Sequence, residues 1–489
     1  MASLRVALRD GGTTVISAGR VDALRSSIRG DIILADQPGY DAARSVWNGM
    51  IDRRPALIAR CVGPRDVVAC VNWARDEGLV LAVRGGGHNI AGSGVCDDGL
   101  VIDLSSMRSV TVDPRRKVAR VGPGATLAEL DHETQAFGLA VPVGVNSTTG
   151  VAGLTLGGGF GWFSRKRGLT ADNLRSALVV TANGKLLSVD ARHESDLFWA
   201  IRGGGGNFGV AVEFEFDLFR LGPQVTAGLV VHPFREAGNV LRHYRSFAAD
   251  APDDVTAWAL IRKAPPLPFL PTDVHGKEVI VLAAFSSAGP RKAKQLLAPL
   301  RAYGRPIADA IGKIPYTAWQ QGFDPMLAPG ARNYWKSHNL DEVSDDAIAS
   351  LIEFGGRLPA PPTDILLAQL GGAVNRVAAD ATAYPHRSNE FLVNAHARWD
   401  DAADDVRCMA WAREFYERAG AVSNGGVYVN FMSGDESRVA GAFGANYARL
   451  AELKRRYDPT NLFRMNHNIA PARQGTSGAP VTELVQQAR

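Results

Sequence analysis

Three glycine-rich segments in the first half of the chain constrain its fold more than any other feature. They are RGGGHNIAGSG from Arg84, GVNSTTGVAGLTLGGGFG from Gly144 and RGGGGNFG from Arg202. Because glycine has no Cβ, its backbone can approach a bulky ligand and adopt positive φ, so that several N–H groups converge on phosphates. One such cluster could equally be a set of tight turns. Three clusters together predict a large ligand held by several loops.

The glycine spacing does not match the common nucleotide-binding motifs. The sequence has no G-x-x-x-x-G-K-[ST] phosphate loop, and GGGHNIAG does not open a helix with an acidic residue at the Rossmann distance. Zinc-protease HExxH and hydrolase GxSxG patterns are also missing. The ligand is therefore expected to be larger than a mononucleotide and to be bound in a different way.

Composition and charge exclude several other classes. The 54 basic and 50 acidic residues are interleaved along the chain, which gives little support for a nucleic acid partner. The four cysteines form neither a CxxC pair nor a zinc-ligand spacing with histidine, so no metal site is expected. Neither a signal peptide nor a membrane-spanning stretch is predicted, which makes a cytoplasmic enzyme with no membrane partner the default expectation.

The order of predicted elements begins with a βαβ-like unit over 56–83, formed by ALIARCV, DVVACVNWARDEG and LVLAVR. The Asn183-Gly184 pair predicts a two-residue turn in a hairpin over 176–190. An Asp-Pro pair ends a helix at residue 457. Other strands are predicted at 101–107, 109–113, 117–124 and 210–219, and other helices at 127–137, 195–201, 291–303 and 402–419.

A chain of 489 residues is too long for one ordinary core, so two domains are expected. The pattern changes near residue 225 to longer helical stretches separated by proline-rich breaks such as KAPPLPFLPTD. This change predicts the start of a second domain.

Five motifs in a fixed order carry a family resemblance. They are RGGGHN at 84–89, VGPG at 121–124, GGGFG at 157–161, GGGGNFG at 203–209 and YDPTNLF at 457–463. With them the chain resembles the berberine bridge enzyme-like branch of the vanillyl-alcohol oxidase flavoproteins, from about residue 54 to 220 and again from about 440 to 472. Together these motifs are highly specific.

The resemblance implies an α+β fold in which an FAD-binding domain of two subdomains is interrupted by a substrate domain. That inserted domain is expected to contain an antiparallel sheet flanked by helices. The expected boundaries are 1–224 for the FAD-binding domain, with core motifs at 54–220, then 225–440 for the substrate-binding domain, 441–472 for a return to the FAD domain, and 473–489 for a loose tail.

The resemblance also implies FAD joined covalently through a ring nitrogen of His88 to the flavin 8α-methyl carbon. The remaining cofactor-binding residues expected from the motifs are Arg84, Gly85, Gly86, Gly87, Asn89, Gly92, Asn146, Ser147, Thr148, Gly150, Gly153, Leu154, Gly157, Gly158, Gly161, Asn207, Gly209, Val210, Asn466 and Asn468.

The sequence departs from the family at the second attachment point. Many members hold FAD a second time through a cysteine, and that position falls on Asn146 here, while a family histidine falls on Leu154. An amide cannot form the thioether, so a single covalent bond without a cysteinyl link is predicted. One bond should give a milder oxidant and favours a small, enclosed substrate.

Catalytic residues are expected in Gly426–Phe431, which resembles a family Y-x-N-Y strand that lines the pocket and often supplies a tyrosine base. The second tyrosine of this pattern is Phe431 here, so the role of base passes to Tyr428 or to another residue. A tyrosine acts as a base near neutrality only if its phenolate is stabilised. Asn430 is expected to contact the substrate or the flavin.

Three functions remain open at this point. The first is an oxidase that removes hydride from an alcohol or amine C–H bond of a small molecule and passes the electrons to oxygen, which gives hydrogen peroxide. The second is a dehydrogenase of the same fold with another acceptor. The third is a flavin-carrying or small-molecule-binding protein without turnover. The substrate and the oligomeric state are left undefined, because the insert carries no readable motif.

Overall fold

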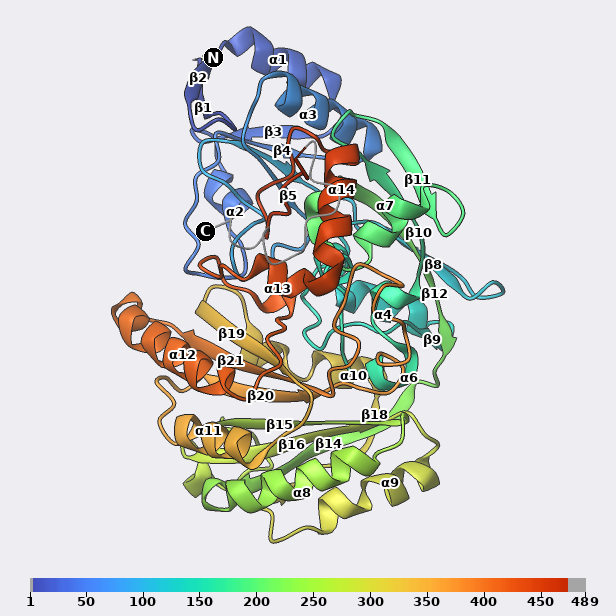
Figure 1. Cartoon of the computed structure of the whole chain (residues 1–489), viewed down its shortest axis with the longest axis vertical. Helices are drawn as coiled ribbons and strands as arrows, with labels where there is room; N and C mark the ends of the chain where they lie inside the picture. Colours follow the sequence, from blue (N-terminus) through green and yellow to red (C-terminus); the bar gives the residue numbers. More distant parts are fainter. Residues whose placement is uncertain (1–2, 474–489) are drawn as a thin grey trace.

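A computed structural model describes residues 3–473 and has the expected α+β class. The proposed tail at 473–489 lies, beyond its first residue, outside the described part. In Figure 1 the elements of the first half lie above a large sheet, and the C-terminal helix α14 (Tyr447–Tyr457) returns to lie among the elements of the first half. No helix in the described range is long and apolar enough to cross a membrane.

The first sheet has four strands in the order β3-β4-β6-β5. β4 (Leu57–Arg60) and β5 (Leu81–Arg84) both pair in parallel with β6 (Leu100–Asp103), while β3 (Asp31–Leu34) is antiparallel to β4. α3 (Pro64–Asp76) connects β4 to β5 and buries one apolar face, which confirms the βαβ-like unit. β5 ends at Arg84, so the first glycine segment leaves the sheet at a strand end.

The second sheet is antiparallel, in the order β11-β10-β12-β8-β7. β10 (Leu174–Val180) and β11 (Leu186–Asp190) form the predicted hairpin, with Gly184 at φ +74° in its turn. The other strands are β7 (Val110–Asp113), β8 (Val118–Val121) and β12 (Val210–Asp217). β8 ends at Val121, before the predicted end at residue 124, because the chain turns at Gly122. Gly122 packs there directly on the main chain, since an added Cβ would lie 2.2 Å from the carbonyl oxygen of Met107.

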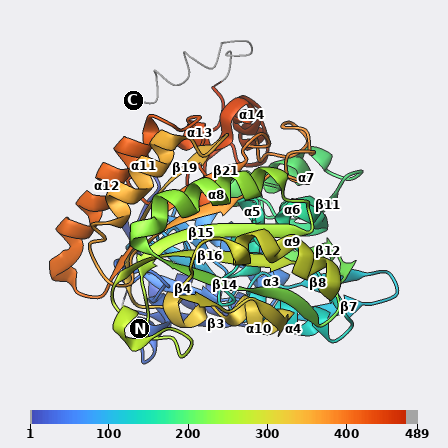
Figure 2. The same ribbon diagram turned by 90° about the horizontal axis from the view of Figure 1, so that it is seen from below.

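The third sheet has eight antiparallel strands and is flanked by helices, as expected for the inserted domain. Helices α8 (Ala237–Asp250), α9 (Pro290–Ala302), α11 (Asp345–Gly355) and α12 (Asp405–Gly420) cover one of its faces, as Figure 2 shows from below. The strands are β14 (Gln224–Pro233), β15 (Val255–Lys263), β16 (Glu278–Ser286), β17 (Ala308–Asp309), β18 (Gly312–Pro315), β19 (Arg332–Leu340), β20 (Asp364–Gln369) and β21 (Phe391–Trp399).

Strand alternation divides the side chains of this sheet between two cores. Residues such as Ile261, Leu367 and Ala395 pack under the helices. Their neighbours Trp258 and Leu366 instead join a cluster that contains Phe160 and Tyr428 from other parts of the chain. The second face of the sheet therefore meets the glycine-rich half of the protein.

One prediction near the C-terminus needs correction. The expected strand at Gly426–Phe431 is wrong: this segment is extended without a sheet partner and ends in a 3-10 turn, η7 (Val429–Phe431). Its start is joined to β19 by two main-chain hydrogen bonds, from Asn424 to Asn339 and from Asn339 to Gly426, both at 3.2 Å, but the turn η7 ends the extended stretch before a ladder can continue. The helix predicted to end at residue 457 is confirmed as α14, which begins at Tyr447 and is separated from α13 (Val439–Phe443) by Gly444 at φ +47°.

The remaining elements connect these layers. They are β1 (Leu4–Ala7), β2 (Thr13–Ile16), α1 (Ala18–Ser27), α2 (Tyr40–Arg44), α4 (Leu127–Gln135), β9 (Leu139–Ala140), α5 (Val151–Leu156), α6 (Ser164–Arg167), α7 (Ser195–Ile201), β13 (Phe219–Arg220) and α10 (Tyr316–Gln321).

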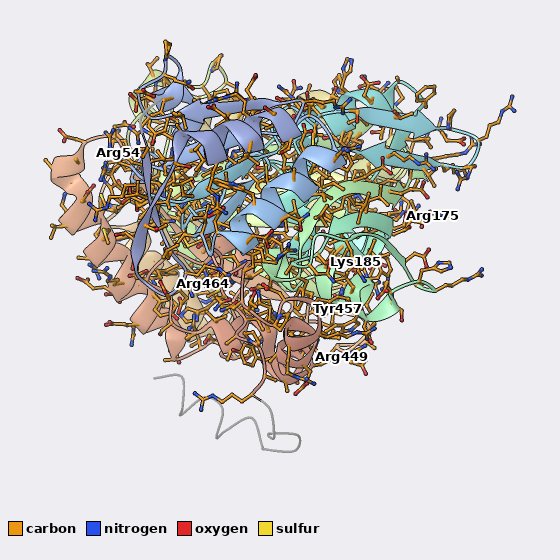
Figure 3. The ribbon with its side chains drawn as sticks, turned by 90° about the horizontal axis from the view of Figure 1, so that it is seen from above. Arg54, Arg175, Lys185, Arg449, Tyr457 and Arg464 are labelled. Atoms are coloured by element: carbon orange, nitrogen blue, oxygen red, sulfur yellow. The ribbon has the colours of Figure 1, made fainter. Side chains whose placement is uncertain are left out.

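Charged side chains are spread over the surface, as their interleaving in the sequence suggests (Figure 3). Arg175 lies 2.9 Å from Asp217, and Arg449 lies 3.0 Å from Asp196. Ion pairs of this kind lower the local positive potential around each guanidinium.

Candidate active site

A cavity of about 320 Å³ lies between the glycine loops and the third sheet. Its walls come from four chain segments far apart in the sequence: 81–94, 144–160, 205–211 and 463–467, together with side chains of the sheet. Sixteen of the predicted site residues line it: Arg84, Gly85, Gly86, Gly87, His88, Asn89, Asn146, Gly150, Gly153, Leu154, Asn207, Gly209, Val210, Tyr428, Asn430 and Asn466.

The other predicted residues lie behind these walls. Gly157 packs against Asn430, and a Cβ added to Gly157 would lie 2.1 Å from the amide oxygen of Asn430. Gly161 packs against Val143, and a Cβ added to Gly161 would lie 1.9 Å from the carbonyl oxygen of Val143. Several of the glycines thus serve contacts between chain segments. The predicted residues outside the cavity lining are Gly92, Ser147, Thr148, Gly157, Gly158, Gly161 and Asn468.

His88 follows the first glycine run and stacks on the Trp47 ring, with ring centroids 4.5 Å apart and planes 24° apart. Its Nε2 lies 3.0 Å from Oγ1 of Thr148. Thr148 gives its hydroxyl proton to Oδ1 of Asn146 at 2.7 Å, so Nε2 of His88 is the donor in the first bond and Nδ1 carries the lone pair. Burial, with a smaller contribution from the charge of Arg398, lowers the pKa of His88 to about 3. The imidazole is therefore neutral at physiological pH.

The C-terminal return brings polar atoms without partners to the glycine loops. The amide nitrogen of Asn466 donates to the carbonyl of Gly206 at 3.1 Å, while its Oδ1 is buried and unpaired within the described residues. Nε2 of His467 and Oδ1 of Asn468 are also buried and have no hydrogen-bond partner within the described residues. Because buried polar atoms are normally paired, the unpaired atoms of Asn466 and His467 in the cavity wall, with that of Asn468 next in the chain, indicate a polar ligand.

Tyr428 is held at the junction between the glycine loops and the sheet. Its hydroxyl oxygen accepts the N–H of Gly159 at 3.0 Å and the amide of Asn430 at 2.9 Å. Burial nevertheless raises the pKa of Tyr428 to about 12. The phenol therefore keeps its proton near neutrality, and it is suited to donate a hydrogen bond rather than to act as a base.

The sheet end of the cavity is apolar and aromatic. Phe431 forms edge contacts with Trp335 at 5.3 Å and Phe160 at 5.7 Å, and Trp258 and Leu366 complete the wall. No sequence motif marks these residues. Their only signal was strand alternation, which places Trp335, Leu366 and Trp258 on one face once the register is known.

Comparison with known proteins identifies the family. An FAD-binding domain model matches residues 55–190, and a "berberine and berberine like" model matches residues 427–470. The chain is 32% identical to (R)-6-hydroxynicotine oxidase of Paenarthrobacter nicotinovorans over 463 residues, which cover 91% of this chain and 97% of the relative. The chain belongs to the berberine bridge enzyme-like FAD-linked oxidoreductases. The family resemblance of the motifs is thus confirmed.

Other relatives agree with this family assignment. An FAD-linked oxidoreductase of Dictyostelium discoideum is 31% identical over 430 residues, which cover 87% of this chain and 91% of the relative. The crystal structure of 6-hydroxy-D-nicotine oxidase from Arthrobacter nicotinovorans superposes with a TM-score of 0.82 at 29% identity, over 91% of this chain and 99% of that one. The berberine bridge enzyme-like fold predicted from the motifs is therefore present.

The residues of the cavity fit FAD. The first two glycine loops approach each other so closely at Gly86 and Gly150 that neither of these residues has room for a Cβ, and the two loops meet there backbone to backbone. The orphan acceptors of Asn466 and Asn468 and the ring nitrogen of His467 lie at the return segment. The aromatic sheet end suits a planar ring system beside the substrate.

Proposed function

We propose that this FAD-linked oxidoreductase is an oxidase that carries its flavin on one covalent bond to His88. It would oxidise an alcohol or amine C–H bond of a small molecule, with oxygen as the acceptor and hydrogen peroxide as a product. The flavin supplies the redox chemistry by accepting hydride at N5. The observation that carries the proposal is the neutral imidazole of His88 in the wall of the glycine-lined cavity.

Attachment requires a ring nitrogen with a free lone pair. The hydrogen bond from Nε2 of His88 to Thr148 leaves that lone pair on Nδ1, and the low pKa keeps the ring unprotonated. Asn146, at the position of the second attachment in many relatives, orients Thr148 instead of bonding to the flavin. These contacts support a single link through His88.

The aromatic end of the cavity supports a small, largely aromatic substrate. Trp258, Trp335, Phe431 and Leu366 offer flat apolar surface, which binds rings through area burial and edge contacts. A relative at 32% identity is named for 6-hydroxynicotine, whose rings would suit such walls. The oligosaccharide oxidases among the structural neighbours share only 23% identity, so their likeness concerns the fold alone.

The two parts of the molecule would divide this work. Residues 1–224 and 441–472 supply the glycine loops and the return segment and would hold FAD, whereas residues 225–440 supply most of the aromatic end and would hold the substrate. Tyr428 and Asn430 lie between these parts. Both hydrogen bonds to the Tyr428 oxygen use its lone pairs, which leaves the phenolic proton for a bound substrate.

Anaerobic mixing with a substrate panel tests the proposal. The panel contains 6-hydroxynicotine, benzyl alcohol and 1-phenylethanol as aromatic compounds and xylobiose as a sugar. We expect an aromatic member to bleach the visible flavin band, and air to restore the band with one peroxide per turnover. Bleaching that persists in air would assign a dehydrogenase instead. A flavin that no aromatic compound reduces would contradict the proposed oxidase and favour the binding protein.

A further inference from the structure

A histidine and an aspartate face each other on the sheet wall of the cavity. His396 on β21 is the register partner of Asp364 on β20, and Nδ1 of His396 lies 2.9 Å from Oδ1 of Asp364. Because cross-strand partners share one face of the sheet, both residues lie on the face opposite the covering helices. His396 lines the cavity, while Asp364 lies behind it with a side chain that is 7% exposed.

This pairing defines the tautomer of His396. Burial alone would raise the pKa of Asp364, but His396, Arg262 and Arg398 together lower it, so the carboxylate is ionised. An ionised carboxylate only accepts hydrogen bonds, so Nδ1 of His396 carries a proton, and in the neutral ring Nε2 carries the lone pair. Nε2 is buried and has no hydrogen-bond partner in the described part of the chain. A basic nitrogen without a partner is thus built into the cavity wall.

A second orphan atom lies beside the first. The ring of Trp335 lies 4.4 Å from that of His396, and its Nε1–H is also buried without a partner among residues 3–473. Nε2 of His396 is a hydrogen-bond acceptor, and Nε1–H of Trp335 is a hydrogen-bond donor. A hydroxyl group satisfies both at once, since it donates through hydrogen and accepts through oxygen.

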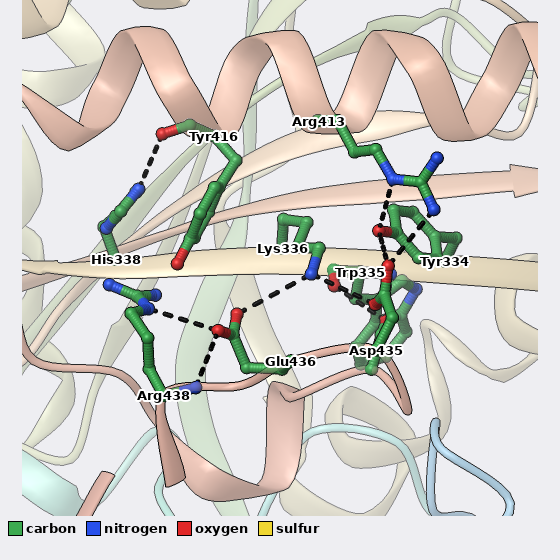
Figure 4. A network of polar contacts seen from close by, with 10 residues as sticks. Tyr334, Trp335, Lys336, His338, Arg413, Tyr416, Asp435, Glu436 and Arg438 are labelled. Atoms are coloured by element: carbon green, nitrogen blue, oxygen red, sulfur yellow. Dashed lines mark hydrogen bonds and ion pairs between the residues drawn. The ribbon is translucent and has the colours of Figure 1, made fainter. Parts of the chain in front are cut away.

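Several other groups near the cavity are unsuited to remove a proton from a substrate, and His467 lies on the return segment that would hold FAD. Tyr428 keeps its own proton near neutrality, and Phe431 has no ionisable group. His88 is committed to FAD in the proposed function. The cluster formed by Lys336, Asp435, Glu436, Arg413 and Arg438 is paired within itself, as Figure 4 shows, and joins β19 to the segment 433–438 and to α12.

From these observations we infer that His396, oriented by Asp364, is the proton acceptor for a substrate hydroxyl, which Trp335 also binds. This inference rests on the proposed function and names the substrate class as an alcohol. The O–H bond breaks as an N–H bond forms on Nε2. The carbinol carbon gives its hydrogen with the bonding electron pair to FAD, so the alcohol becomes a carbonyl compound. The proton on Nε2 then passes to water.

Charged groups around the pair favour this role. Arg262 on β15 lies 3.6 Å from the second carboxylate oxygen of Asp364, and Arg398 acts on Asp364 from the same strand as His396. These cations keep Asp364 ionised, and Asp364 in turn stabilises the imidazolium that forms when His396 takes a proton. The neighbouring rings of Trp335 and Phe431 carry no charge.

His396→Gln is the informative variant, because its amide still donates to Asp364 but has no basic nitrogen. His338→Gln is the matched control: His338 is buried in the same sheet and has an unpaired ring nitrogen, but it packs against Tyr416 of α12 and does not line the cavity. With 1-phenylethanol we expect His396→Gln to slow anaerobic flavin reduction by about 10²–10⁴-fold, as loss of a general base does, and His338→Gln to leave the rate unchanged.

A binding measurement tests His396 independently of turnover. 4-Nitrophenol is an aromatic hydroxyl compound whose ionised form has a distinct visible band. Difference spectra should show that the wild type and His338→Gln bind it with a lowered apparent pKa, and that His396→Gln does not lower this pKa. Equal ionisation in all three proteins, or equal reduction rates, would overturn the role of His396. If no panel compound reduces the flavin but the nitrophenol shift depends on His396, the oxidase proposal fails while the proton acceptor is supported.

Discussion

The main chains of Gly86 and Gly150 lie back to back. A Cβ built on Gly86 would lie 2.5 Å from Cα of Gly150, and one built on Gly150 would lie 2.6 Å from the nitrogen of Gly86. Gly86 precedes His88 by two residues, and Gly150 is the N-cap of α5. This contact, together with the hydrogen bond between His88 and Thr148, therefore sets where the imidazole stands relative to the second glycine loop.

Gly150→Ala tests this contact. Gly150 has φ −72° and ψ 134°, which alanine adopts without strain, so the cost arises from the clash alone. We expect the free energy of unfolding to fall by about 1–3 kcal/mol, the usual cost of overpacking, and the flavin content of purified protein to fall as well. Chemical denaturation and the ratio of flavin to protein absorbance measure both effects.

Gly19→Ala is the control for this variant. Gly19 is exposed in α1, and an added Cβ there meets no atom within 4 Å. Alanine should leave the flavin content unchanged and raise the free energy of unfolding by about 0.5–1 kcal/mol. A Gly150→Ala protein that is as stable and as yellow as the wild type would show that the two loops separate readily.

Lys454 ties the C-terminal return to the third glycine segment. Its buried ammonium donates to the carbonyl of Asn207 at 2.7 Å, to Asp458 at 2.8 Å and to the carbonyl of Phe463 at 2.9 Å. Lys454→Met leaves Asp458 as an uncompensated buried charge, so we expect a loss of about 3–5 kcal/mol in the free energy of unfolding. Urea denaturation measures this loss in the free energy of unfolding. Arg455→Met, at an exposed pair with Glu452, should change this free energy by less than about 1 kcal/mol, and similar losses in both variants would contradict the role of Lys454.

Asp131 in α4 gives the protein a predicted pH dependence of stability. Burial raises the pKa of Asp131 to about 7. The hydrogen bond from Gln320 lowers this pKa, but by less than burial raises it. A carboxyl group whose folded-state pKa is raised stabilises the fold while it is protonated, and this contribution is lost as the pH rises from the unfolded pKa of 3.8 to about 7. Asp131→Asn removes the ionisation.

Thermal unfolding at two pH values measures this effect. The Tm of Asp131→Asn relative to wild type should increase between about pH 5.5 and about pH 8.5, because only the wild type buries a charge at the higher pH. Asp22→Asn, at an exposed pair with Arg25, should show no such increase. A Tm difference between Asp131→Asn and wild type that is the same at both pH values would mean that Asp131 titrates normally.

The glycine motifs predicted the location of the cavity well, because each motif is a local backbone requirement that can be read without the fold. Sixteen of the predicted site residues line the cavity. Glycines such as Gly157 and Gly161 were harder to interpret, since a glycine that admits a ligand and one that admits a neighbouring chain look the same in sequence.

The aromatic end of the cavity could not be predicted from the sequence. Trp335, His396 and Asp364 lie on three different strands, and only their register brings them together. Non-local pairing of this kind leaves no local pattern. The strand predicted at Gly426–Phe431 failed for a related reason: its residues suit a strand, but the turn η7 ends the extended stretch beside β19 after a few residues.

Denaturation of the purified protein in acid tests the central claim most directly. The wild-type pellet should stay yellow, and mass spectrometry of its peptides should place one FAD on the peptide that contains His88. His88→Ala should release all its flavin to the supernatant, while His467→Ala, which removes another imidazole from the same cavity, should keep it in the pellet. A wild-type pellet that is colourless, with all of its flavin in the supernatant, would contradict the covalent attachment at His88.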